Sequence, residues 1–317
     1  MGNRSLLQKG TLKKDSYKFK IVDEMKGSVG VVIPVFNRPE MLERAVQSIQ
    51  SKDGIDLQLV VVDDASTEDL SSVRSAVENA GHRWLSLDEN SGPAYCRNAG
   101  VEVLSSDWVC FLDSDDFWYP GKLEVQLAWH LENPSVRISQ VEEQWHRDGG
   151  PVKKPAHWVQ KGGNLFADSI ERCSIGPSCV MMRRDLWDET GGFDPAFRVC
   201  EDYELWLRIT ADEEVGLIPG GPLISKEGGH SDQLSFLVPA MDRFRVWALL
   251  NLLKNAVLKP EETQLICEGI RSKSAILAKG AEKRGKEDQA GFYRKLSATG
   301  DQLSPDEWLD KARLWCR

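Results

Sequence analysis

The chain has 317 residues, of which 41% are hydrophobic and 28% charged, and this balance predicts a packed core and excludes wholesale disorder. A formal net charge of -9 argues against general binding to nucleic acid or to anionic membranes. No apolar run approaches the roughly 20 residues that cross a bilayer, and residues 1–26 lack the apolar middle of a signal peptide, so we expect a cytoplasmic protein.

Strand and helix patterns alternate through the first 132 residues. Strands are expected where β-branched or apolar residues form short runs, and helices where apolar residues recur at i, i+3, i+4 and i+7. The expected elements are a strand at residues 29–36, a helix from Pro39, a strand at 57–62, a helix near 70–80, a strand at 83–87, a helix near 94–104, a strand at 108–112 and a helix at 123–132. This alternation predicts an α/β fold with a mainly parallel sheet flanked by helices.

The pattern weakens at residues 140–163, which carry tryptophans, histidines, prolines and glycines. We interpret this stretch as an excursion from the sheet, the usual place for acceptor-binding loops. Trp145 and Trp158 could stack on sugar rings, although large aromatic residues more often serve as packing anchors. A regular pattern returns with a strand at residues 178–182 and a helix near 184–189.

From Met241 to its end the chain reads as almost wholly helical, and we place a boundary near Pro239. The expected division is an N-terminal extension at residues 1–27, a catalytic domain at 28–239 and a helical segment at 240–317. The helical segment has an apolar face that could dock on the catalytic domain, on a second subunit in a homodimer, or on a membrane surface. This face consists of Phe244, Trp247, Leu250, Leu253 and Val257.

Three carboxylates follow the apolar run at residues 108–112, at Asp113, Asp115 and Asp116. A buried strand would deliver them to its carboxyl end, where an α/β sheet opens its ligand crevice. Oxygen ligands at this spacing suit Mg²⁺ or Mn²⁺, which would share its coordination shell with substrate phosphates. The alternative for an isolated motif of this kind is a solvated turn.

Two further segments carry polar groups suited to a nucleotide. Asp63 and Asp64 end the second strand and could accept hydrogen bonds from a nucleobase imide and from ribose hydroxyls, although such residues also cap helices. Gly92 and Pro93 open a helix that carries Arg97 about one turn in. A helix N-terminus with a guanidinium suits a diphosphate, whereas an isolated arginine is more often a surface ion-pair residue.

Later in the chain, Glu201 and Asp202 stand at the start of an amphipathic helix, where acidic residues also simply complement the helix dipole. His230 lies in a Gly-rich loop, and the ordinary interpretation of an isolated histidine is structural. The seven cysteines form no CxxC pair, which favours reduced and mostly buried thiols.

Taken in order, these segments resemble the family 2 glycosyltransferases, which are inverting enzymes with the glycosyltransferase A fold. The resemblance covers roughly residues 29–236, and the order of its motifs is more specific than any one of them. The motifs are Val-Val-Ile-Pro-Val-Phe-Asn at residues 31–37, Val-Asp-Asp-Ala-Ser at 62–66, Asn-Ser-Gly at 90–92, Arg-Asn-Ala-Gly at 97–100, Leu-Asp-Ser-Asp-Asp at 112–116, Gly-Gly-Phe-Asp at 191–194 and Glu-Asp at 201–202.

The resemblance implies a metal-dependent enzyme that moves a sugar from a nucleoside diphosphate sugar, usually UDP-linked, to a hydroxyl acceptor in polysaccharide or glycoconjugate biosynthesis. It implies a nucleotide-sugar partner, a bound Mg²⁺ or Mn²⁺, and Asp202 as the general base with Glu201 beside it. Asp115 would bind the metal, and His230 falls where related enzymes place a late metal or phosphate ligand. The implied donor-binding residues are Pro34, Val35, Asn37, Asp63, Asp64, Arg97, Asp113 and Ser114. The family layout also places residues 181–184 where they could close the crevice behind the acceptor.

Two other classes of function stay open from the sequence. A noncatalytic nucleotide-sugar-binding protein could retain Asp63, Asp64 and Asp115, although it would not need Glu201 and Asp202. A sugar-nucleotide pyrophosphorylase also uses an α/β sheet and Mg²⁺, but it should carry a Gly-rich phosphate loop after the first strand, where this chain has residues 34–39. A dinucleotide dehydrogenase is disfavoured because no GxGxxG motif occurs.

Overall fold

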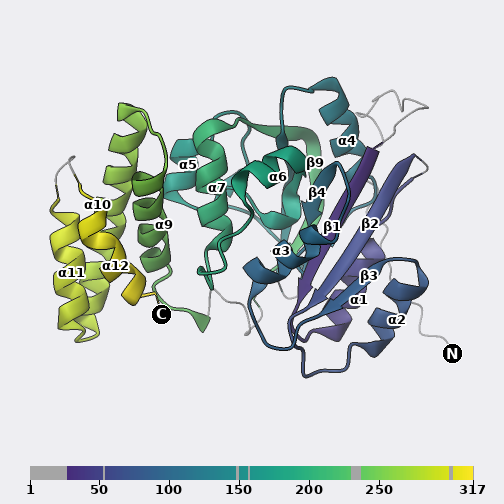
Figure 1. Ribbon diagram of the computed structural model, residues 1–317, viewed down its shortest axis with the longest axis horizontal. Coiled ribbons are helices and arrows are strands. Elements are labelled where there is room, and N and C mark those ends of the chain that lie inside the picture. Colours follow the sequence, from purple (N-terminus) through teal and green to yellow (C-terminus); the bar gives the residue numbers. More distant parts are fainter. Residues whose placement is uncertain are drawn as a thin grey trace.

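The computed structural model describes residues 27–52, 54–147, 150–155, 158–229, 237–299 and 303–316. These residues form an α/β structure around one mixed sheet, with a group of helices at the end of the molecule away from β2 and β3 (Figure 1). The strands follow the order β3-β2-β1-β4-β8-β6-β9-β5, and β7 pairs with β6. The predicted α/β class is confirmed.

The first half of the sheet is parallel, as the alternating pattern predicts. Its strands are β1 (Gly27–Val35), β2 (Ile55–Asp63), β3 (Arg83–Ser86) and β4 (Trp108–Phe111). The connecting helices are α1 (Pro39–Ser48), α2 (Ser71–Asn79) and α3 (Pro93–Glu102). Because these strands run the same way, the residues that follow β1, β2 and β4 meet at one edge of the sheet.

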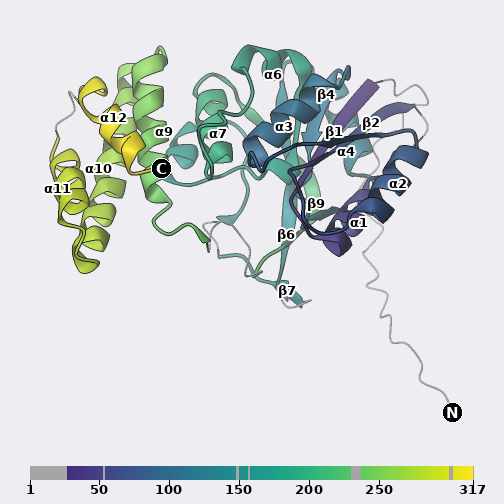
Figure 2. The ribbon, with the colours of Figure 1, turned by 60° about the horizontal axis from the view of Figure 1, so that its bottom comes forward.

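Helices cover both faces of this half, as Figure 2 shows for α3 on one side and α1 and α2 on the other. Alternate residues of β1 point to opposite faces, so that Val31 packs toward α1, α2 and α4 (Lys122–Glu132). Val32 packs toward α3, α6 (Arg184–Thr190) and α7 (Glu201–Asp212). Gly100 in α3 lies so close to β1 that an added Cβ would stand 2.3 Å from Cγ1 of Val32. The glycine of the Arg-Asn-Ala-Gly motif therefore lets α3 approach the sheet.

The second half of the sheet is mixed. β8 (Val180–Arg183) runs antiparallel to β4 and to β6 (Ile138–Arg147), and β9 (Val215–Glu227) runs parallel to β6. β5 (Phe117–Trp118) pairs with β9, and β7 (Gly150–Val152) pairs with β6. Residues 180–183 thus form a strand close to the predicted one at 178–182.

The predicted excursion from the sheet is wrong for residues 140–147, which form most of β6. The strand departs from the hydrophobic pattern because it carries polar side chains that form hydrogen bonds inside the fold. Gln140 is fully buried and its side-chain amide donates to the carbonyl oxygen of Lys161, while Glu143 accepts a hydrogen bond from Trp145 Nε1. The sequence of β6 therefore lacks the alternation of apolar and polar residues by which a strand is usually predicted.

The C-terminal helices are α9 (Asp242–Asn255), α10 (Pro260–Lys283), α11 (Glu287–Ser297) and α12 (Asp306–Leu314). They share one hydrophobic core with α5 (Phe166–Glu171) and α7. At this junction the ring of Phe197 stacks on Trp247, with centroids 4.0 Å apart. Of the docking alternatives, the structure shows packing on the rest of the chain for Phe244, Trp247 and Leu250, whereas Val257 lies fully exposed beyond α9.

Within the described residues, every helix is too short or too polar to cross a bilayer. None of the seven cysteines forms a disulfide within the described residues, and six of them are buried, in agreement with the predicted burial. Cys173 is the partly exposed one.

Candidate active site

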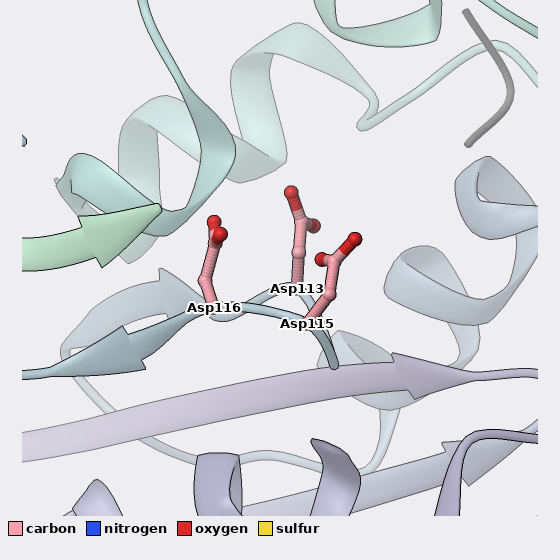
Figure 3. Close-up of side chains that lie close together, drawn as sticks. All are labelled: Asp113, Asp115 and Asp116. Atoms are coloured by element: carbon pink, nitrogen blue, oxygen red, sulfur yellow. The ribbon is translucent and has the colours of Figure 1, made fainter. Parts of the chain in front are cut away.

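The acidic loop after β4 brings three carboxylates together. Asp113, Asp115 and Asp116 each offer an oxygen atom, and these atoms lie within 4.8 Å of one another. All three side chains project from the same side of the loop (Figure 3). Ser114, between them, is buried.

Ser178 fixes the shape of this loop. Its hydroxyl oxygen accepts a hydrogen bond from the backbone N–H of Asp113 at 3.1 Å and donates to Oδ2 of Asp116 at 2.7 Å. Asp116 is only 1% exposed, and its Oδ1 is buried with no hydrogen-bond partner among the described residues. A cluster of hard oxygen donors with one unsatisfied buried oxygen fits Mg²⁺ or Mn²⁺. No sequence motif marks Ser178, whose role arises from the pairing of β8 with β4.

Each acidic side chain also has a basic neighbour. Arg97 Nη2 lies 2.7 Å from Oδ1 of Asp113, and Arg38 Nη1 lies 3.1 Å from Oδ2 of Asp115. Lys226 on β9 interacts electrostatically with Asp116 and Asp113. Burial alone would lower the pKa of Lys226, but the nearby carboxylates raise it well above its usual value. Lys226 has no motif around it, and sequence reasoning missed it.

The carboxylates respond differently to these surroundings. Burial would raise the pKa of Asp113, but Arg97 and Lys226 outweigh it and hold that pKa below its usual value. Burial and the charge of Asp113 raise the pKa of Asp115, and burial raises the pKa of Asp116 well above its usual value. The cluster therefore combines groups with unequal affinity for protons, and a divalent cation would compete with protons at Asp115 and Asp116.

Asn37 joins the loop after β1 to the loop after β2, and Asp63 shapes the second of these loops. The backbone N–H of Asn37 donates to the Ser66 hydroxyl at 2.7 Å, and Oδ1 of Asn37 accepts from the backbone N–H groups of Thr67 and Glu68 at 2.9 and 3.1 Å. Oδ1 of Asp63 accepts from the backbone N–H of Ser66 at 2.9 Å. Asn37 has φ 60°, a left-handed conformation that asparagine tolerates. The motif asparagine thus shapes the loop.

Asp64 has a similar structural task. Its two carboxylate oxygens accept from the backbone N–H groups of Ser91 and Gly92 at 2.6 and 2.9 Å, and its side chain is buried. Its backbone N–H donates to the carbonyl oxygen of Val35, which ends β1 beside the buried Pro34. Asp64 therefore joins β1 to the turn that opens α3. Asp63 is partly exposed and is the member of the pair with the more accessible carboxylate.

Arg97 connects the acidic loop to α7. The residue is only 4% exposed, and its guanidinium bonds Asp113 at 2.7 Å and Glu201 at 2.8 Å. Both carboxylates hold the guanidinium in place, so in this structure Arg97 is a bridge between two acidic elements. Burial, only partly offset by Arg97, raises the pKa of Glu201 to about 7.

Asp202 follows Glu201 at the start of α7 and faces a cavity of about 250 Å³. The thiol of Cys173 donates to Oδ2 of Asp202 at 3.1 Å. The cavity is also lined by Trp145, Trp158 and Lys226, and the two indole rings have centroids 5.5 Å apart. The structure thus brings both predicted tryptophans and the predicted base to one cavity, together with Cys173.

One predicted feature does not join this group. The interpretation of residues 181–184 as a closure behind the acceptor is wrong, because Met181 and Met182 are fully buried in the core while Arg183 and Arg184 bond to Asp185 and Asp188. These methionines belong to β8, whose two faces both lie against hydrophobic clusters. His230 lies outside the described residues.

The chain was compared with known proteins. A family model described as "Glycosyl transferase family 2" matches residues 30–191, about half of the chain. An uncharacterized glycosyltransferase of Rickettsia felis is 31% identical over 188 residues, which is 59% of this chain and 31% of that protein. The chain thus spans about a third of the length of the Rickettsia relatives that it matches.

Two further relatives match over more of their own length. The putative teichuronic acid biosynthesis glycosyltransferase TuaG of Bacillus subtilis is 30% identical over 58% of this chain and 72% of that protein. The UDP-Glc:alpha-D-GlcNAc-diphosphoundecaprenol beta-1,3-glucosyltransferase WfgD of Escherichia coli is 26% identical over 62% of this chain and 76% of that protein.

Solved structures share the fold. S. aureus TarS 1-349 in complex with UDP-GlcNAc has a TM-score of 0.57 and 14% identity, and the match covers 84% of this chain and 90% of that chain. The mannosyltransferase PcManGT from Pyrobaculum calidifontis in complex with GDP-Man and Mn2+ has a TM-score of 0.54 and 18% identity, over 92% of this chain and 85% of that chain.

Proposed function

Because the chain belongs to glycosyl transferase family 2, we propose that it transfers a sugar from a nucleoside diphosphate sugar to a hydroxyl acceptor with inversion at the anomeric carbon. The observation that carries this proposal is the Asp113–Arg97–Glu201 bridge, which ties the acidic loop to the helix that begins with Asp202. Donor and acceptor chemistry would meet across this bridge.

The donor side would be built from the loops after β1, β2 and β4. Asp63 would accept hydrogen bonds from the nucleobase or the ribose, and Asn37 and Asp64 would hold the two loops in shape. A divalent cation, Mg²⁺ or Mn²⁺, held by Asp113, Asp115 and Asp116, would stabilise the charge that develops on the departing diphosphate. We propose UDP as the nucleotide, a choice supported by the names of WfgD and of the TarS complex.

The acceptor side would be the cavity next to Asp202. Asp202 would take the proton from the acceptor hydroxyl, a contribution of about 10² to 10⁴ in rate. The Cys173 thiol would orient the carboxylate, and Trp145 and Trp158 would give an apolar wall for a sugar ring. Names such as TuaG and WfgD support an acceptor in polysaccharide or glycoconjugate synthesis.

The test combines binding with turnover. Thermal shift with UDP, GDP, UDP-Glc, UDP-GlcNAc and GDP-Man, each with and without Mn²⁺, should identify the donor by the stabilisation that a ligand gives to the folded state. Asp115→Ala should remove the Mn²⁺-dependent part of this stabilisation. If the unmodified chain binds the nucleotides equally well with and without Mn²⁺, the metal site is refuted.

Asp202→Asn should leave donor binding nearly intact and abolish transfer, measured as acceptor-dependent release of the nucleoside diphosphate. Asp306→Asn is a matched control, since Asp306 is also an acidic residue in a helix's first turn but is 70% exposed and lies in α12. Unchanged release by a folded Asp202→Asn variant would remove Asp202 from the base role. Specific donor binding without release by the unmodified chain would favour a noncatalytic nucleotide-sugar-binding protein.

A further inference from the structure

The three basic neighbours of the acidic loop are held in different ways. Arg97 is fixed between Asp113 and Glu201 and is almost fully buried. Lys226 interacts with Glu143 as well as with the loop. Arg38 Nη1 contacts Oδ2 of Asp115, with side-chain exposures of 21% and 16% for the two partners. Arg38 has a more accessible side chain than Arg97, and it occupies the carboxylate assigned to the metal.

This ion pair sets up a competition. Oδ2 of Asp115 is the atom that Arg38 contacts at 3.1 Å, and Asp115 belongs to the cluster whose oxygens could surround one ion. A divalent cation bound there would stand within a few ångströms of the guanidinium, and like charges at that separation repel strongly in a partly buried site. Cation binding therefore requires the Arg38 side chain to move away from Asp115.

The backbone around Arg38 limits where the side chain can go. Asn37, directly before it, is tied to the loop at residues 66–68, and Pro39, directly after it, begins α1. With the backbone held at both neighbours, the long side chain moves while its Cα stays at the edge of the sheet. A nucleoside diphosphate entering with the cation would place negative oxygens within reach of this edge, where a guanidinium binds phosphate oxygens well.

We propose that Arg38 is an exchangeable counterion. Without ligand it occupies Asp115 and weakens binding of a divalent cation alone, and when nucleotide and cation enter together it transfers to the diphosphate. This inference rests on the proposed function for its diphosphate half. Its consequence is that the chain binds the cation tightly only together with the nucleotide.

The experiment measures two affinities in the full chain. One is the dissociation constant of Mn²⁺ alone, from loss of the free-ion electron paramagnetic resonance signal, and the other is that of UDP or GDP at saturating Mn²⁺, by calorimetry. For Arg38→Gln we expect about tenfold tighter Mn²⁺ binding and about tenfold weaker nucleotide binding, the fold-change of one charge-assisted hydrogen bond. Arg38→Lys keeps the charge and should fall between the two proteins in both measurements.

Arg44→Gln is the matched control. Arg44 also lies beside this loop, but it bonds the backbone carbonyl oxygen of Asp115 and the carboxylate of Glu227. An equal gain in Mn²⁺ affinity in Arg44→Gln would overturn the inference, because loss of any nearby positive charge would then explain it. Unchanged Mn²⁺ affinity in Arg38→Gln would overturn the competition, and unchanged nucleotide affinity would overturn the transfer to the diphosphate.

The proposed function and the competition between Arg38 and the cation can be refuted by different results. If the unmodified chain binds neither UDP nor GDP with Mn²⁺ present, the proposed function and the diphosphate half of the inference are both overturned. The measurement with Mn²⁺ alone still decides the competition between Arg38 and the cation, since it needs no nucleotide.

Discussion

Replacing Arg97 by methionine should destabilise the fold strongly. The side chain is 4% exposed and its two charge-assisted hydrogen bonds, at 2.7 and 2.8 Å, satisfy the carboxylates of Asp113 and Glu201. Removing one partner from a buried ion pair costs about 3 to 5 kcal/mol, because the charge left behind has no compensation. We therefore expect Arg97→Met to lower the free energy of unfolding by about that amount at neutral pH or above.

The loss should grow with pH, and the direction follows from Glu201. Its pKa in the folded chain is about 7, above the usual 4.5, and Arg97 is the group that holds it down against burial. Without Arg97 this pKa rises further, so between 4.5 and the raised value the folded state binds a proton that the unfolded state lacks. Stability of the variant then falls as pH rises through that window. The loss should be larger at pH 8 than at pH 6.

Urea unfolding followed by tryptophan fluorescence at both pH values measures this effect. Arg74→Met is the control, since Arg74 pairs with Glu78 on the surface with exposures of 51% and 47%, and its loss should stay below about 1 kcal/mol. In Arg97→Met/Glu201→Gln the total loss should fall short of the sum of the single losses by at least about 1 kcal/mol. A loss in Arg97→Met that matches Arg74→Met, or that does not change with pH, would refute the bridge.

Two other substitutions test how the site is supported. Ser178→Ala should cost about 1 to 3 kcal/mol in urea unfolding, because it removes the hydroxyl that bonds Asp116 and the backbone N–H of Asp113; a loss below about 0.5 kcal/mol would contradict this. Gly100→Ala should cost about 1 to 3 kcal/mol, since the new Cβ would stand 2.3 Å from Val32. The control is Gly291→Ala, at a helical position with no atom within 4 Å of the added Cβ, and this variant should be neutral or stabilising. Equal changes in stability for the two glycine variants would argue against the close packing of α3.

Periodicity predicted the parallel half of the sheet well because β1, β2 and β4 contain runs of buried apolar residues, and α1 and α2 each bury one apolar face. β1 and β2 begin and end within two residues of the expected bounds. The same reasoning failed at β6, where Gln140 and Glu143 form hydrogen bonds with partners distant in sequence. Polar residues with internal partners look like loop residues when only the sequence is read.

The sequence predicted those residues of the candidate site that belong to a recognisable motif. Asp113, Asp115 and Asp116 come together as their spacing at a strand end indicates. The partners that set their charges were not predictable, since Lys226 comes from β9 and Ser178 precedes β8 without any local signature. Arg97 illustrates a related limit, because the sequence shows a guanidinium near a helix start but not the two carboxylates that hold it.

The stacking of Phe197 on Trp247 indicates how much of the chain a protein prepared for activity measurements must include. Phe197 precedes α7 and is fully buried against α9. A shortened protein that stopped before residue 240 would expose the face of this ring that Trp247 covers, close to the start of α7 where Asp202 lies. The family model matches residues 30–191, so the unit that must be expressed to study turnover is considerably larger than that match.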